Sequence, residues 1–179
     1  MLDLLIIILL LYAIYAGARR GIALQLVYTI GYLLSFGLAR LFFRQLGPSL
    51  ELWIPYPSAT LASDFTFFSS KVGLTLDKSF YAGIAFLMIL FAGWLVTRFV
   101  AIFFHQLTYV PFKKHINHIG GGLLGFLVVY CGITLVLSLL AVIPITAIQS
   151  LLAHSFLAGL MIQHTPILSH QIWTWWLLK

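Results

Sequence analysis

Two long apolar runs at the start of the chain are separated by only three residues, the RRG at positions 19–21. The first run covers residues 2–18 and would reach roughly 25 Å as a helix, near the minimum that crosses a bilayer. The second covers residues 22–43. Two such runs with so short a connection must form a tight antiparallel hairpin, and Gly17 and Gly21 supply the backbone freedom for it.

The composition indicates that lipid surrounds these runs. Hydrophobic residues make up 62% of the 179 residues and charged residues 8%, whereas soluble domains have roughly 45–50% and about 25%. A single core of this length could not bury so much apolar surface. The net charge of +6 comes from basic residues scattered near the ends of the runs, which favours contact with anionic lipid headgroups over nucleic-acid binding.

Two further runs complete the predicted spans, at residues 80–104 and 119–143. The sequence therefore predicts an all-α membrane protein with four transmembrane helices, forming one integral membrane domain over residues 1–179. Arg98 falls late in the third run and marks the approach to one membrane face, since its long side chain can reach the headgroups.

The segment 45–79 is too polar and too interrupted by proline to cross a membrane. Its many aromatic residues predict a re-entrant or interfacial loop region with one or two short amphipathic helices. The best helical piece is 58–73, with Ser58 as a candidate N-cap.

The C-terminal segment 145–179 is apolar, contains Gln149 and His154, and ends with three tryptophans in WTWW. Tryptophan favours the headgroup level of a bilayer. We expect an amphipathic interfacial helix followed by an aromatic anchor. The alternative is a fifth crossing within this segment.

Charge orients the four predicted spans. The turn at Arg19 and Arg20 and the linker with Lys113 and Lys114 fall on one side, while both chain ends and segment 45–79 fall on the other. The basic residues are level in number on the two sides, so the orientation rests on the tight arginine turn, which should stay cytoplasmic. We expect both the N-terminus and the C-terminus to lie outside.

The arginine pair first fixes topology, because moving two guanidinium groups across the membrane would cost several kcal/mol. A second reading is that Arg19 and Arg20 also bind an anionic lipid headgroup or an acidic segment of a partner. Asp3, near the outer end of the first run, is expected to be an interfacial cap favoured by the helix dipole, with ion passage as the alternative.

Glycines open the last run. Gly121 and Gly125 stand four residues apart beside Gly122, a spacing that lets helices approach closely in lipid. We expect them to pack within the bundle, against glycines of the second or third run. The alternative is a homodimer contact.

No residue pattern points to catalysis, a cofactor or a metal. His115 and His118 lack a nearby carboxylate or thiolate, and Cys131 is the sole cysteine. The chain has four carboxylates, no GxSxG and no Walker motif. We therefore expect no enzyme.

An acidic residue at the start, an apolar run, and then glycine, a basic pair and glycine resemble the CvpA family, named for colicin V production. The matching positions are Asp3, Gly17, Arg19, Arg20 and Gly21, and the stretch from 115 to 143 with its glycines is similar to the family's closing segment. The resemblance implies a multi-pass protein of the bacterial cytoplasmic membrane, linked to production or export of a bacteriocin toxin.

Two functions follow from these observations. The first is a membrane scaffold or accessory subunit that supports toxin export or envelope upkeep through a membrane-protein partner. The second is a small channel or transporter subunit that forms a homo-oligomer through its glycine-rich helices. Since no charge lies in the middle of a span, ion coupling is disfavoured.

Overall fold

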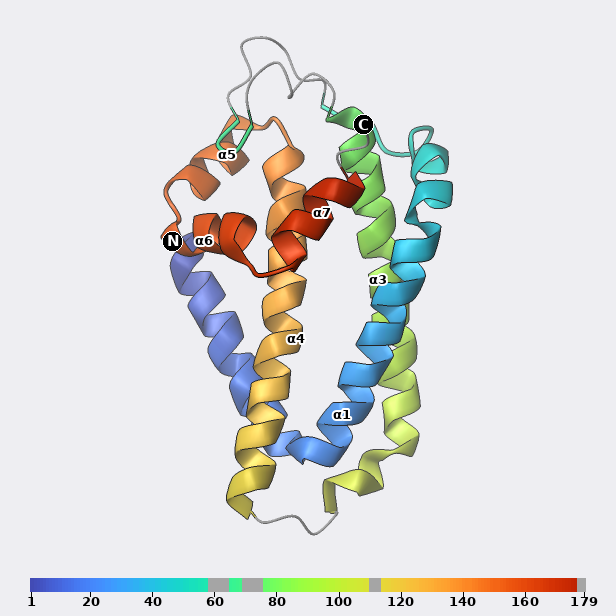
Figure 1. The fold of residues 1–179 in the computed structure, drawn as a ribbon, viewed down its shortest axis with the longest axis vertical. Coiled ribbons are helices and arrows are strands. Elements are labelled where there is room, and N and C mark those ends of the chain that lie inside the picture. The colour runs from blue at the N-terminus through green and yellow to red at the C-terminus, as the bar shows by residue number, and fades with distance from the viewer. Residues whose placement is uncertain (58–64, 69–75, 110–113, 177–179) are drawn as a thin grey trace.

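The computed structural model describes residues 1–57, 65–68, 76–109 and 114–176. All regular elements in these ranges are helical, with no strand among them. Three helices are long and apolar enough to cross a membrane: α1 (Leu2–Leu50), α3 (Asp77–Phe103) and α4 (Lys114–Val142). The described chain is therefore an all-α protein built on three long helices (Figure 1).

The runs predicted as separate helices at 2–18 and 22–43 belong to the single 49-residue helix α1. This helix is broken at Gly21, whose φ of 76° and ψ of 170° are not helical. Figure 1 shows the two parts diverging from the bend like the arms of a V. We call residues 2–20 the first arm and residues 22–50 the second arm. The predicted reversal is present, but it takes place inside one helix, with no loop between the arms.

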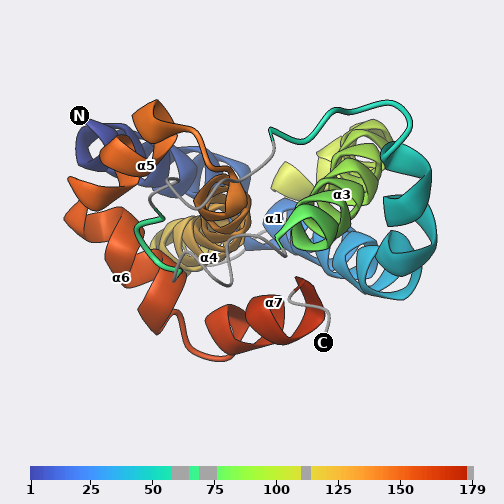
Figure 2. The ribbon, with the colours of Figure 1, turned by 90° about the horizontal axis from the view of Figure 1, so that it is seen from above.

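Each arm of α1 packs against a different long helix. The first arm lies along α4, where Ile6 and Leu137 share a buried cluster. The second arm lies along α3, where the rings of Phe43 and Phe86 meet edge to face at 6.0 Å. Since α3 and α4 make few contacts with each other, the bundle consists of two helix pairs that are joined at the bend (Figures 1 and 2).

Several helices extend further than the sequence predicted. The second arm continues to Leu50, with Pro48 in its last turn, although we expected the loop region to begin at residue 45. Helix α3 begins at Asp77 and α4 at Lys114, before the apolar runs at 80 and 119. Hydrophobicity marks only the part of a helix that lies in lipid, and these helices extend beyond it at their polar ends. A short 3₁₀ helix, η1 (His105–Tyr109), follows α3.

Segment 45–79 lies only partly within the described residues. Ser58 and most of the predicted helical piece 58–73 fall outside them, and the described part, 65–68, is not helical. This part is held by Gln149, whose Oε1 accepts a bond of 2.9 Å from the backbone N–H of Thr66. The Gln149 amide in turn donates to the carbonyl of Ile143 at 2.8 Å. One side chain thus links the loop region to the end of α4.

Tyr56 makes a second link to the end of α4. Its hydroxyl donates to the carbonyl of Val142 at 3.1 Å, and its ring lies 4.9 Å from that of Phe80. Burial, aided by the negative charge of Asp77, raises the pKa of Tyr56 to about 12. The phenol therefore stays protonated and keeps donating at every physiological pH.

The C-terminal segment forms three short helices: α5 (Thr146–Ala153), α6 (Phe156–His164) and α7 (Leu168–Trp176). Nine residues of helix span about 14 Å, too little to cross a bilayer. A fifth crossing is therefore wrong for the described part of this segment. Figure 1 shows α6 and α7 lying across the bundle, and Figure 2 shows α7 lying in front of the space between the two helix pairs.

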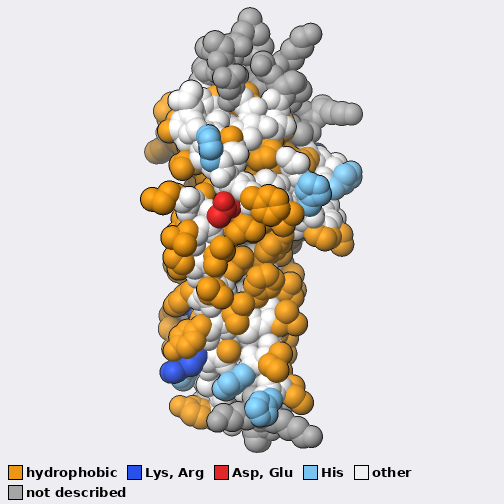
Figure 3. All heavy atoms as spheres, turned by 90° about the vertical axis from the view of Figure 1, so that its left-hand side faces the viewer, with side chains coloured by type: hydrophobic (Ala, Val, Ile, Leu, Met, Phe, Trp, Pro, Cys, Tyr) orange, Lys and Arg blue, Asp and Glu red, His pale blue; other side chains and the backbone are white. Residues whose placement is uncertain are grey.

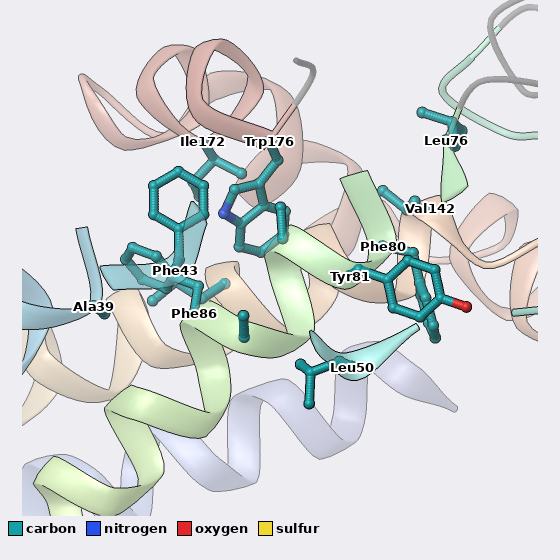
Figure 4. Close-up of a cluster of buried hydrophobic side chains, with 13 residues drawn as sticks. Ala39, Phe43, Leu50, Leu76, Phe80, Tyr81, Phe86, Val142, Ile172 and Trp176 are labelled. Carbon is teal, nitrogen blue, oxygen red and sulfur yellow. The ribbon is translucent and has the colours of Figure 1, made fainter. Parts of the chain in front are cut away.

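The predicted tryptophan anchor is wrong in its details, because Trp176 is fully buried in protein. Its ring lies 6.1 Å from that of Phe86 and close to Gly83 of α3, within the largest buried apolar cluster (Figure 4). Trp175 lies under the guanidinium of Arg40, at 4.4 Å. Trp175 and Trp176 thus pack α7 against the second arm and α3.

Hydrophobic side chains cover the outside of the bundle as well. Figure 3 shows one side of the molecule, where they form a broad band between a basic side chain in the lower part of the view and an acidic side chain a little above its middle. Many large apolar residues of α1 and α3 are exposed, Leu33, Leu41 and Ile102 among them. This surface suits a lipid environment.

We predict that Trp176→Ala lowers the free energy of unfolding by about 3–5 kcal/mol, because it empties a large buried site. Denaturation of the purified chain in detergent micelles measures this change. The matched control is Trp53→Ala, whose side chain is 83% exposed and whose loss should change stability by less than about 0.5 kcal/mol. Equal effects of the two substitutions would contradict the described packing of α7.

Candidate functional site at the arginine bend

The bend at Gly21 is fixed by a side chain of α4. The φ of 76° and ψ of 170° at Gly21 lie in a region open essentially to glycine alone. The next residue, Ile22, donates its backbone N–H to Oδ1 of Asn117 at 2.7 Å. A Cβ on Gly21 would lie 2.7 Å from Nδ2 of the same asparagine. Asn117 therefore satisfies the backbone where the helix is interrupted.

Glycines allow the first arm and α4 to touch through their backbones. A Cβ on Gly17 would collide with the carbonyl oxygen of Gly121 and lie 3.1 Å from Cα of Gly125. A Cβ on Gly125 would lie 2.6 Å from the carbonyl of Ala13. In lipid, where apolar burial does not drive helices together, such contact between small residues is a main source of association.

The partner of these glycines differs from the one we expected. Gly121 and Gly125 meet Gly17 of the first arm, whereas the prediction placed them against glycines of the second or third run. Beyond Ile22 the bend turns the second arm away from α4, so the glycine that meets Gly121 and Gly125 comes from the first arm. Glycines of the other pair meet hydroxyl residues instead: Gly31 lies against Thr97, and Gly93 against Ser35.

The two adjacent arginines have different surroundings. Arg20 is half-buried, donates from Nη1 to Oε1 of the buried Gln25 at 3.3 Å, and lies 4.4 Å from the ring centre of Tyr28. Arg19 is exposed, and its nearest ring is that of Tyr15 at 5.9 Å. Arg19 is free to reach headgroups, while Arg20 is held against the second arm.

Arg98 of α3 reaches the same place from another helix. Its guanidinium carbon lies 4.9 Å from the ring of Trp94 and 5.9 Å from that of Tyr28. Tyr28 therefore faces cations from two helices, Arg20 and Arg98, in contacts that a ring quadrupole favours. The sequence placed Arg98 near a membrane face but gave no sign that it would lie beside Arg20.

Asp3 lies in the first turn of α1, at the far end of the first arm. Its Oδ1 accepts from the Ser155 hydroxyl at 2.7 Å and from the backbone N–H of Leu157 at 2.8 Å. Ser155 is itself the N-cap of α6, accepting from Ala158 at 3.1 Å. Asp3 thus also caps a second helix, more than 150 residues away, through the free N–H groups of its first turn.

Comparison with known proteins places the chain in a family. Residues 2–166 match the family model described as Colicin V production protein. The chain belongs to the colicin V production protein family. It is also 34% identical over 178 residues to the uncharacterized transmembrane protein YshB of Bacillus subtilis (strain 168), covering 97% of this chain and 98% of that protein. No solved structure matches.

In this member of the colicin V production family, the structure brings Gly17, Gly21, Gly121 and Gly125 together with Asn117, and it leaves Asp3 at the opposite end of the first arm. Gly122 is also buried, against Ile14. Sequence reasoning missed Asn117, Gln25 and Tyr28. Gln25 and Tyr28 could have been found because they closely follow the arginine turn, whereas the only signal for Asn117 was its place just before the glycines of the last run.

Side chains that could bind a metal ion do not gather in the part of the chain that the structure describes. No three side chains of His, Cys, Asp or Glu converge there on a position that could hold a metal ion. The single thiol, Cys131, is exposed on α4. The candidate site is the bend with the guanidinium groups of Arg20 and Arg98 around Tyr28, and guanidinium groups can bind anionic groups.

We predict that Gly17→Ala destabilises the protein by about 1–3 kcal/mol, because the added methyl group forces the two backbones apart. The matched control is Gly37→Ala in the second arm, where a Cβ would meet no atom within 4 Å. Its effect should stay within about 0.5 kcal/mol. Unfolding in detergent with increasing sodium dodecyl sulfate compares the two, and equal losses would contradict the backbone contact.

Proposed function

We propose that the chain crosses a bacterial cytoplasmic membrane four times and acts there as a scaffold or accessory protein with no catalytic activity of its own. The spacing of charges supports the four crossings. Arg20 at the bend and Arg40 on the second arm lie 20 positions apart, as do Lys78 and Arg98 on α3. Twenty residues of helix span about 30 Å, the thickness of the hydrocarbon layer.

The orientation follows from the bend. Arg19, Arg20 and Arg98 lie at the end of the bundle where α1 reverses, and the sequence adds Lys113 just before α4 and Lys114 as its first residue. Positive charges in short connections stay preferentially in the cytoplasm. On this basis the bend faces the cytoplasm, while the N-terminus and the C-terminal helices face outward.

The observation that carries the scaffold role is the charge-free interior of the crossings. No charged residue lies between Asp3 and Arg19, between Arg20 and Arg40, or between Lys78 and Arg98. Coupled transport of ions normally needs such a residue. The lipid-facing side instead offers Gly37 and Gly132, where a Cβ would meet nothing within 4 Å and the backbone of a partner helix can approach.

The family description, Colicin V production protein, supports a role in producing or exporting a peptide toxin, or in upkeep of the cell envelope, through a membrane-protein partner. The alternative, a channel subunit that oligomerises through the α4 glycines, has less support. Gly121, Gly122 and Gly125 are all buried inside the bundle, so they offer no surface to a second copy.

Cysteine labelling in a Cys131→Ser background tests the proposed orientation. In intact cells an impermeant maleimide should modify Ser49→Cys, at the far end of the second arm, but not His118→Cys, near the bend; both positions are exposed. Permeabilised cells should show both labelled, which serves as the control. Labelling of His118→Cys in intact cells would reverse the proposed orientation.

We predict that the purified protein in liposomes shows no ion flux above that of empty liposomes, while in-cell crosslinking captures a membrane-protein partner. Leu38→Trp, next to Gly37 on the exposed face of the second arm, should weaken the crosslink by roughly tenfold, since loss of a close helix contact costs about 1.4 kcal/mol or more. Robust conductance would favour the channel and contradict the scaffold.

A further inference from the structure

An apolar groove lies where the two helix pairs separate. It has a volume of about 440 Å³ and is lined by six residues of α3, from Ile84 to Leu95, together with Leu139 of α4. None of these side chains carries a polar group. One end of the groove is closed where Gly83 of α3 meets Leu139 and Trp176.

The groove has the length of one lipid leaflet. From Ile84 to Leu95 the helix rises about 16 Å, and half of the hydrocarbon layer measures about 15 Å. With this length and an entirely apolar lining, the groove suits an extended hydrocarbon chain.

Arg98 stands at the open end of this groove. It follows Leu95 by three residues and continues the stripe of positions 84, 87, 91 and 95 along the same side of α3. Its side chain is exposed and leans on Trp94 and Tyr28. The guanidinium therefore lies at the level where a chain in the groove would meet its headgroup.

Arg20 places a second cation beside it. Both guanidinium carbons lie within 6 Å of the Tyr28 ring centre, at 4.4 Å and 5.9 Å. The described carboxylates lie at the opposite end of the bundle: Asp3 begins the first arm, Glu51 follows the second, and Asp77 begins α3. The described residues thus leave two positive charges beside the groove with no acid to neutralise them.

We propose that the groove and the two arginines form a binding site for one anionic phospholipid of the cytoplasmic leaflet. One acyl chain occupies the groove, and Arg98 and Arg20 bind the phosphate, for which a planar guanidinium is a favoured partner. The inference rests on the proposed membrane placement and deepens it. The chain recognises a specific lipid, and recognition occurs between the two helix pairs.

Native mass spectrometry of the full chain tests this site. The protein is exchanged into micelles holding equal amounts of phosphatidylglycerol and phosphatidylcholine with identical acyl chains. The wild type should retain phosphatidylglycerol with about a tenfold preference, and Arg98→Gln should abolish it, since a charged hydrogen bond accounts for a factor of that size. Arg98→Lys should keep part of the preference. Arg44→Gln, an exposed arginine at the other end of the second arm, should keep all of it.

A second pair of variants tests the groove. Ala92→Phe should displace the acyl chain and lower retention of both lipids, while Val96→Phe, an exposed position of α3 outside the groove, should not. Equal retention of the two lipids by the wild type, or no effect of Ala92→Phe, overturns the proposal.

Soluble probes separate a lipid from a free anion. Inorganic phosphate and glycerol 3-phosphate at millimolar concentration should not displace phosphatidylglycerol, because they cannot fill the groove. Displacement by inorganic phosphate would show a free-anion site and overturn the lipid assignment. The Ser49→Cys and His118→Cys variants report placement independently. If they label as predicted while the wild type shows no lipid preference, only the lipid site is refuted.

Discussion

The reversal of α1 at Gly21 is the constraint on which the rest of the structure depends. A side chain at this position would be strained by the backbone angles and would strike Asn117. Because the reversal happens within one turn, the two arms leave it at an angle. Each arm then needs its own partner, and the bundle divides into two pairs that stay apart along most of their length.

The space between the pairs gives the C-terminal helices their role. Helix α7 lies across this space, and its tryptophans bind to the second arm and α3. Asp3 and Ser155 tie the start of α6 to the first arm. The same separation leaves the apolar groove along α3 below Leu139. One backbone feature therefore explains the bundle, its cover and the candidate lipid site.

The sequence predicted the helices and the reversal well, because both follow from local features: apolar length, and the RRG between two glycines. It did not predict partners. The spacing of Gly121 and Gly125 shows that some backbone will come close, but which one depends on the angle at Gly21, which no local pattern records. The sequence did not predict the burial of Trp176 for a similar reason. A tryptophan near a chain end favours the membrane interface unless a space inside the protein is available to it.

The pairing of the first arm with α4 has a consequence for how the protein is made. Gly17 is synthesised about a hundred residues before Gly121, its partner. At roughly 5–20 residues per second, the first arm waits for several seconds in the membrane before α4 arrives. During translation its glycine face is open to other helices, including those of the insertion machinery. The contact between the first arm and α4 therefore forms only after the glycines of α4 have been synthesised.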